Sequence, residues 1–151
     1  MMNRPGGGHG PEARLRTMRI LWAAFLMNVG LFVAVTHFGS ADVGERAGRA
    51  GGVPPLLYAL AAVGLASVVA SFFAKGVFYR RAAERREPAL VQTGFILALA
   101  LSEVAALLGV VGVFITLSDY AYALFALGAL GILLHFPSRE QVSAPYYKST
   151  V

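Results

Sequence analysis

Four apolar runs divide this chain and constrain its fold more than any other feature. They cover residues 19–38, 54–74, 89–117 and 120–136. A helix needs about 20 mostly apolar residues to cross a bilayer, whereas a surface helix of a soluble protein carries a polar stripe. The last three runs are apolar on all sides, and only 14% of the 151 residues are charged. The sequence therefore predicts an all-α integral membrane protein, a four-helix bundle.

The segments between the runs predict the domain organisation. Residues 1–18 form a basic arm that we expect to be disordered, and the Gly-rich stretch 39–53 reads as a flexible loop. Pro54 and Pro55 suit the first turn of the second helix. Residues 19–137 then form the membrane domain, and residues 138–151 form a C-terminal tail.

The basic residues predict the orientation of the bundle. Eleven of the 13 lie in the N-terminal arm, the connection between the second and third runs, or the C-terminal tail. Arg46 and Arg49 are the two on the opposite side. Because Lys and Arg accumulate in cytoplasmic flanks, we expect both termini to face the cytoplasm, in a multi-pass protein of the cell inner membrane. The alternative for the first run is a cleaved signal peptide, which would leave three helices and an inverted charge balance.

Glu103 is the one acidic residue inside the runs, at the midpoint of the third. Desolvation disfavours its charged form, so we expect a neutral acid. Asn28 is the midpoint of the first run, and Ser67 lies about one turn from the centre of the second. Gln92 is the polar residue on the face that carries Glu103. These residues are the candidate ion-binding site, and we expect a hydrogen bond between Asn28 and Glu103.

Two functions fit a carboxylate at this depth. In the first, Glu103 binds a proton or a small cation within the membrane. In the second, the protein is structural or accessory, and Glu103 is a neutral clasp that holds helices together. A cation site needs further oxygen ligands around Glu103, whereas a clasp needs only Asn28.

The stretch Ala82–Ile115 resembles the second half of subunit c, the rotor-ring proteolipid of rotary ATP synthases. Arg86-Glu87-Pro88 stands where that family has its polar loop motif, and the segment from Leu101 to Gly109 stands where the family has its ion-carrying carboxylate. The resemblance implies that Glu103 carries a proton or sodium ion. This chain departs from the family at three points. It lacks the repeated Gly-x-Gly of the family's first helix, and its loop motif contains Glu87 where the family has an amide. It also has two extra helices that flank the hairpin.

No other chemistry is predicted. The chain has no cysteine, and its sequence offers no nucleophile–base pair, metal cluster or phosphate loop, so we expect no enzyme, no cofactor and no nucleic-acid partner. Partners are expected to be the bilayer and a second copy or another membrane protein. Anionic lipid head groups are expected at the basic residues around the second connection, which are Lys75, Arg80, Arg81, Arg85 and Arg86. His37 and His135 are expected at opposite membrane surfaces.

Overall fold

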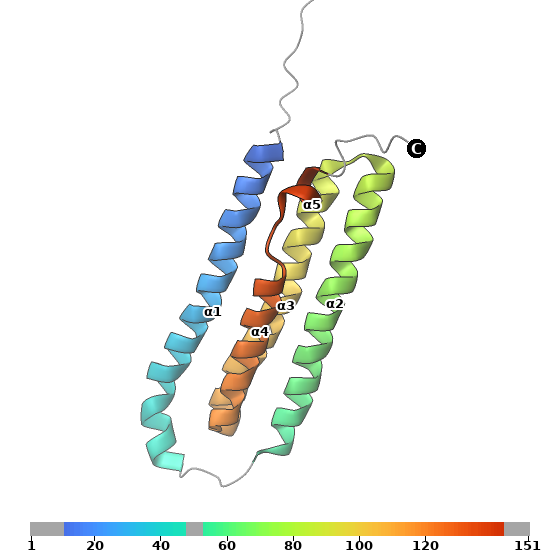
Figure 1. The fold of residues 1–151 in the computed structure, drawn as a ribbon. Coiled ribbons are helices and arrows are strands. Elements are labelled where there is room, and N and C mark those ends of the chain that lie inside the picture. The colour runs from blue at the N-terminus through green and yellow to red at the C-terminus, as the bar shows by residue number, and fades with distance from the viewer. Residues whose placement is uncertain (1–10, 48–52, 144–151) are drawn as a thin grey trace, which may run out of the picture.

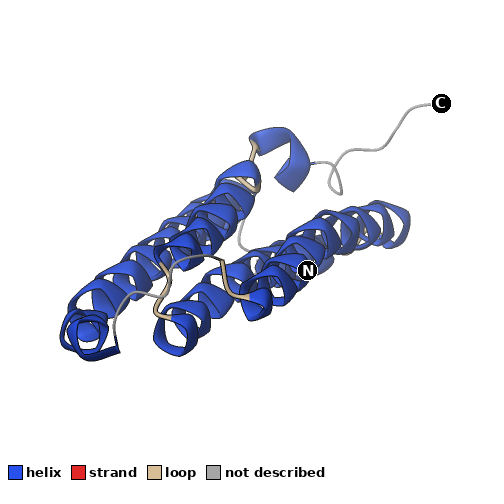
Figure 2. Ribbon diagram, turned by 90° about the horizontal axis from the view of Figure 1, so that it is seen from below, coloured by secondary structure: helices blue, strands red, loops and turns tan. Residues whose placement is uncertain are grey.

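The computed structural model describes residues 11–47 and 53–143, and this part of the chain is helical without strands (Figure 2). Its elements are α1 (Pro11–Ala47), α2 (Pro55–Arg85), α3 (Pro88–Thr116), the 3₁₀ turn η1 (Asp119–Ala121), α4 (Tyr122–Leu134) and α5 (Arg139–Ser143). Successive long helices run in opposite directions (Figure 1). The all-α prediction is confirmed for the described residues.

Proline and left-handed residues set the helix ends. Pro55 and Pro88 begin α2 and α3, where the missing proline N–H costs nothing because that group would have no partner within the helix. Arg86 and Leu117 follow α2 and α3 in the left-handed conformation, with φ of 53° and 51°. Each donates its backbone N–H to a carbonyl of the last turn, on Ala82 and Val113 respectively. These caps turn the chain sharply into the next helix.

Helix α3 lies at the centre and packs against α1, α2 and α4 (Figure 1). In the most apolar 18-residue stretch of α3, 44% of the residues are buried inside the protein, against 11% in the corresponding stretch of α1 and 22% in that of α2. Glycine residues at the contacts allow α2 and α4 to approach α3 closely. A Cβ on Gly128 of α4 would lie 2.9 Å from the backbone nitrogen of Ala106, and one on Gly94 of α3 would overlap the Cβ of Phe78. Without Cβ atoms at these positions, the helices pack almost backbone to backbone.

Helix α1 extends beyond the predicted span at both ends. Residues 11–18, expected to be disordered, are helical, because Leu15 and Met18 bury their side chains in the core. Residues 39–47, expected to lie in a loop, continue the helix. Gly39 does not end it, since the ring of Phe114 packs against this position and one glycine costs a helix only about 1 kcal/mol. Residues 1–10, 48–52 and 144–151 of the predicted arm, loop and tail lie outside the described part.

Three helices, α1, α2 and α3, are long and apolar enough to cross a membrane. Large apolar side chains point outward from them: Met27, Phe73 and Phe38 are 74%, 72% and 80% exposed. A soluble protein does not display such a surface without a partner, so these are the features of a helical membrane protein. The fourth apolar helix, from Asp119 to Leu134, is shorter.

The contact between Gly94 and Phe78 yields a test of the helix packing. Gly94→Ala should lower the free energy of unfolding by about 1–3 kcal/mol, because the added methyl group overpacks the α2–α3 interface. Gly76→Ala is the matched control, since no atom lies within 4 Å of its added Cβ. The control should leave stability unchanged or raise it by up to about 1 kcal/mol. Unfolding in detergent micelles measures both, and equal effects would contradict the packing.

Candidate functional site

The amide of Asn28 on α1 donates a hydrogen bond from Nδ2 to Oε1 of Glu103 on α3. Both side chains are half-buried at the seam between the two helices. The expected contact between these residues is therefore present. The second carboxyl oxygen, Oε2, makes no hydrogen bond to a described residue, so it remains open to a further partner.

The other two candidate ligands do not join this pair. Gln92 lies eleven residues before Glu103 on α3, which is a rise of about 16 Å along the helix. Ser67 is half-buried on α2, and neither side chain hydrogen-bonds to a residue in the described ranges. The direct contact of Glu103 is thus with one amide donor.

A second polar group, which the sequence did not predict, joins α2, α3 and α4. His135 follows the last residue of α4, and its Nε2 lies 2.7 Å from the Oγ of Ser71 on α2. Ser102 on α3 lies 3.3 Å from the same Ser71 oxygen. All three side chains are at most 1% exposed, and Phe72 covers His135 at a ring distance of 4.5 Å. We call Ser71, Ser102 and His135 the buried network.

His135 was expected to be an interfacial residue, and the structure buries its side chain inside the protein. The sequence places it at the end of the fourth apolar run, where a polar residue normally reaches the interface. The chain ends α4 at Leu134 and buries the imidazole against Ser71 and Phe72 instead. Ser71, Ser102 and His135 belong to three different runs. Their spacing in the sequence does not predict that their side chains meet.

A serine hydrogen-bonded to a histidine is also the beginning of a nucleophilic site. The Ser71 hydroxyl donates to the carbonyl of Val68. When its single hydrogen is used there, Ser71 can only accept, and the His135 ring is then the donor of the N–H between them. A nucleophilic serine requires the opposite arrangement, in which the imidazole takes the hydroxyl proton. Because both groups are also buried, the geometry favours an interhelical tie.

Trp22 forms a third contact between helices. Its indole N–H on α1 donates to the carbonyl of Ile132 on α4 at 2.8 Å, and its ring meets the edge of Phe136 at 5.2 Å. Trp22 is half-buried, and these two contacts give it a structural role between α1 and the end of α4.

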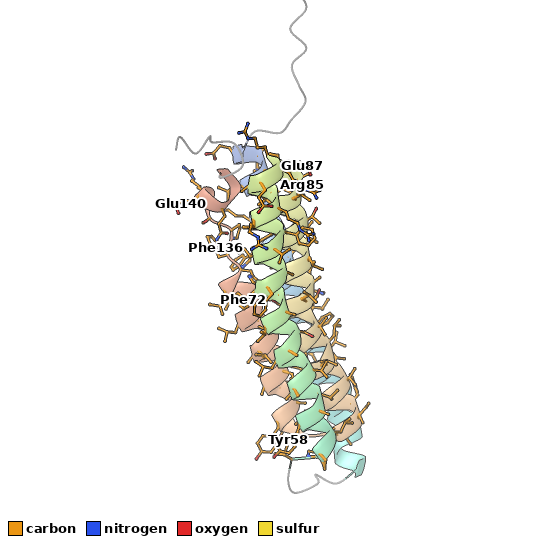
Figure 3. All side chains as sticks on the ribbon, turned by 90° about the vertical axis from the view of Figure 1, so that its right-hand side faces the viewer. Tyr58, Phe72, Arg85, Glu87, Phe136 and Glu140 are labelled. Atoms are coloured by element: carbon orange, nitrogen blue, oxygen red, sulfur yellow. The ribbon has the colours of Figure 1, made fainter. Side chains whose placement is uncertain are left out.

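The basic residues of α2 approach the α2–α3 connection, at the same end of the molecule as α5 (Figures 1 and 3). Arg80 lies 3.9 Å from Glu84, and both are well exposed. The ammonium group of Lys75 lies 5.4 Å from the centre of the Tyr79 ring. Within residues 11–47 and 53–143, no three His, Asp or Glu residues gather in a way that could hold a metal ion.

Comparison with protein-family models, with curated proteins and with solved structures finds no match for this chain. The function must therefore be argued from the residues and their geometry.

The buried network predicts unequal effects for two serines of α2. Ser71→Ala should lower the free energy of unfolding by about 1–3 kcal/mol, because it leaves the buried imidazole of His135 without its partner. Ser67→Ala, one turn earlier, removes a hydroxyl without a described partner and should change stability by less than about 0.5 kcal/mol. Unfolding of the two variants in the same detergent provides the measurement. A larger effect at Ser67 would contradict the assignment.

Proposed function

We propose that this chain is an integral membrane protein in which Glu103 binds a proton within the apolar layer. The observation that supports the proposal is the hydrogen bond from Asn28 to one oxygen of Glu103, with the other oxygen free of described partners. The amide holds the carboxyl group at a fixed place in both protonation states. The free oxygen is where a proton can add and leave.

A proton fits this arrangement better than a metal cation. Sodium or another hard cation needs several oxygen ligands to replace its water shell. Ser67 and Gln92, the two side chains expected to supply them, make no bond to Glu103, and the nearest polar partner is an amide that offers its N–H. A proton needs only the carboxyl oxygen itself.

The second candidate function is a structural or accessory role, in which neutral Glu103 is a clasp. The same hydrogen bond supports it, because it joins α3 to the helix with the smallest buried share. A clasp of this kind contributes about 0.6 kcal/mol on average in lipid. The two functions differ in whether the proton exchanges while the protein is folded.

Our proposal also includes the orientation of the helices in the membrane and a fourth spanning helix. The start of α1, the α2–α3 connection and α5 lie at one end of the molecule (Figure 1), and most of the basic residues belong to these segments. By the positive-inside rule this end faces the cytoplasm of the inner membrane, with α4 as the fourth member of the bundle. Its basic residues would attract anionic lipid head groups.

The resemblance to rotor subunit c belongs to the same proposal. Helices α2 and α3 form the hairpin that carries the carboxylate, with Arg86-Glu87-Pro88 at its turn. Helix α1 covers the side of α3 that holds Glu103, so the chain cannot close a ring in the way a simple hairpin does. We therefore propose a relative of subunit c that acts as a small oligomer or inside a larger membrane complex.

The proposed orientation is tested with reporter fusions. A reporter fused after Val151 should show cytoplasmic activity, and one inserted near Gly48 should not, because basic flanks resist translocation. The reverse pattern would refute both the orientation and the alignment with the subunit-c hairpin.

The protonation of Glu103 is tested with dicyclohexylcarbodiimide, which reacts with protonated carboxylic acids in apolar surroundings. The reagent should label Glu103, because the other seven acidic residues lie in flanks and connections. Labelling should decrease as the pH rises, disappear in Glu103→Gln, and persist in the matched control Glu87→Gln. Mass spectrometry of the labelled peptides gives the readout.

The outcomes separate the candidate functions. Protection by sodium or lithium would identify a cation site and overturn the proton assignment. Absence of labelling at every pH between about 6 and 9 would mean that Glu103 is ionised or inaccessible. In vesicles that contain a pH dye, faster proton leak through the wild type than through Glu103→Gln supports proton exchange. Equal leak leaves the clasp as the function.

A further inference from the structure

One groove of the molecule combines positive charge with an apolar wall, away from Glu103 and the buried network. It lies between the beginning of α1 and α5 and has a volume of about 310 Å³. Its wall is formed by Leu15, Ile20 and Ala23, and its rim carries the guanidinium groups of Arg16, Arg19 and Arg139. The first turns of α1 supply most of these residues. The chain turns at Pro137, so that Arg139 of α5 lies beside the beginning of α1.

The rim of the groove carries an excess of positive charge. Glu12 is the one acidic residue of the lining, and its carboxylate lies 3.9 Å from Arg139. Arg16 and Arg19, three residues apart on one face of α1, make no ion pair within the described part of the chain. Two of the three guanidinium groups are therefore available to an anion.

The groove lies where the charged beginning of α1 meets its apolar part. Arg19 is the last charged residue before the apolar run of α1, and its guanidinium lies 5.7 Å from the centre of the Phe136 ring. Figure 3 shows Glu140 close to the end of the molecule that carries Arg85 and Glu87, and Phe136 farther from that end. Below Arg19 the wall continues as Ile20, which is 61% exposed, and Ala23. A phosphate at the arginines thus has apolar surface directly beneath it.

We propose that this groove binds an anionic phospholipid, with its phosphodiester between Arg16 and Arg19 and an acyl chain along Ile20 and Ala23. Guanidinium groups suit phosphate because their planar fork gives two parallel hydrogen bonds to its oxygens. The site takes an anionic lipid in preference to a zwitterionic one, since its single carboxylate is paired with Arg139 and is not available to a choline or an ethanolamine group.

Trp22, the single tryptophan, provides a local readout. It lies one turn after Arg19 and next to Ala23 on α1, so a brominated acyl chain in the groove quenches its fluorescence. The full-length protein is reconstituted in phosphatidylcholine vesicles that contain a minor fraction of brominated phosphatidylglycerol or, in parallel, of brominated phosphatidylcholine. Brominated phosphatidylglycerol should quench the Trp22 fluorescence more strongly than brominated phosphatidylcholine. Arg16→Gln with Arg19→Gln should reduce this preference by about tenfold or more, since each basic residue contributes about fivefold near an anionic surface.

Two further variants keep the test independent of folding. Arg80→Gln with Arg81→Gln removes the same charge from α2 at the same end of the molecule. This variant lowers the general attraction of anionic lipid, but it should keep most of the difference in quenching at Trp22, because neither residue lines the groove. Glu12→Gln removes the competing carboxylate and should increase it. Equal losses in the two double variants would show general attraction of anionic lipid and overturn the site, as would an unchanged preference in Glu12→Gln. Suppression of the quenching by soluble glycerol phosphate would assign the groove to a free phosphate compound and overturn the lipid. None of these results depends on Glu103.

Discussion

The need of polar side chains in apolar surroundings for a hydrogen-bond partner shapes the helix contacts of this structure. Short hydroxyl side chains meet it alone. Thr36, Ser102 and Thr116 each donate to a carbonyl of their own helix three or four residues earlier. The longer polar side chains cannot reach back in this way. Asn28 and Trp22 therefore bond to other helices.

These interhelical bonds hold together helices that have little other reason to associate. Apolar side chains gain nothing from leaving lipid for a protein surface that is equally apolar, so close packing and polar contacts decide which helices meet. Helix α1 buries the smallest share of its apolar window, and it is joined to α3 through Asn28 and to α4 through Trp22. Helix α2 has the glycine contacts with α3 and, in addition, the bond from Ser71 to His135.

Sequence reasoning could predict the features that depend on one segment at a time. The apolar runs predicted the helices, and Pro54 and Pro55 predicted where α2 begins. The pairing of Asn28 with Glu103 was also predictable, because each residue is the midpoint of its run and equal depth brings midpoints together. Glu103 as a proton site stays a prediction. The helical extension over residues 39–47 was not predictable from glycine content, since it depends on Phe114 of another helix.

The buried network could not be predicted because it follows from the shortness of α4. With 13 residues, α4 rises about 20 Å, less than half the length of α1, α2 or α3. The last turn of α4 is buried among the other helices, since Ile132 and His135 are at most 1% exposed, and its free carbonyls need donors there. The indole of Trp22 and the backbone N–H of His135 both donate to the carbonyl of Ile132. The chain leaves the helix here with the polar ring of His135 still inside the protein, and Ser71 is the neighbour that bonds it. The end of α4 thus determines where the second polar group of the protein lies.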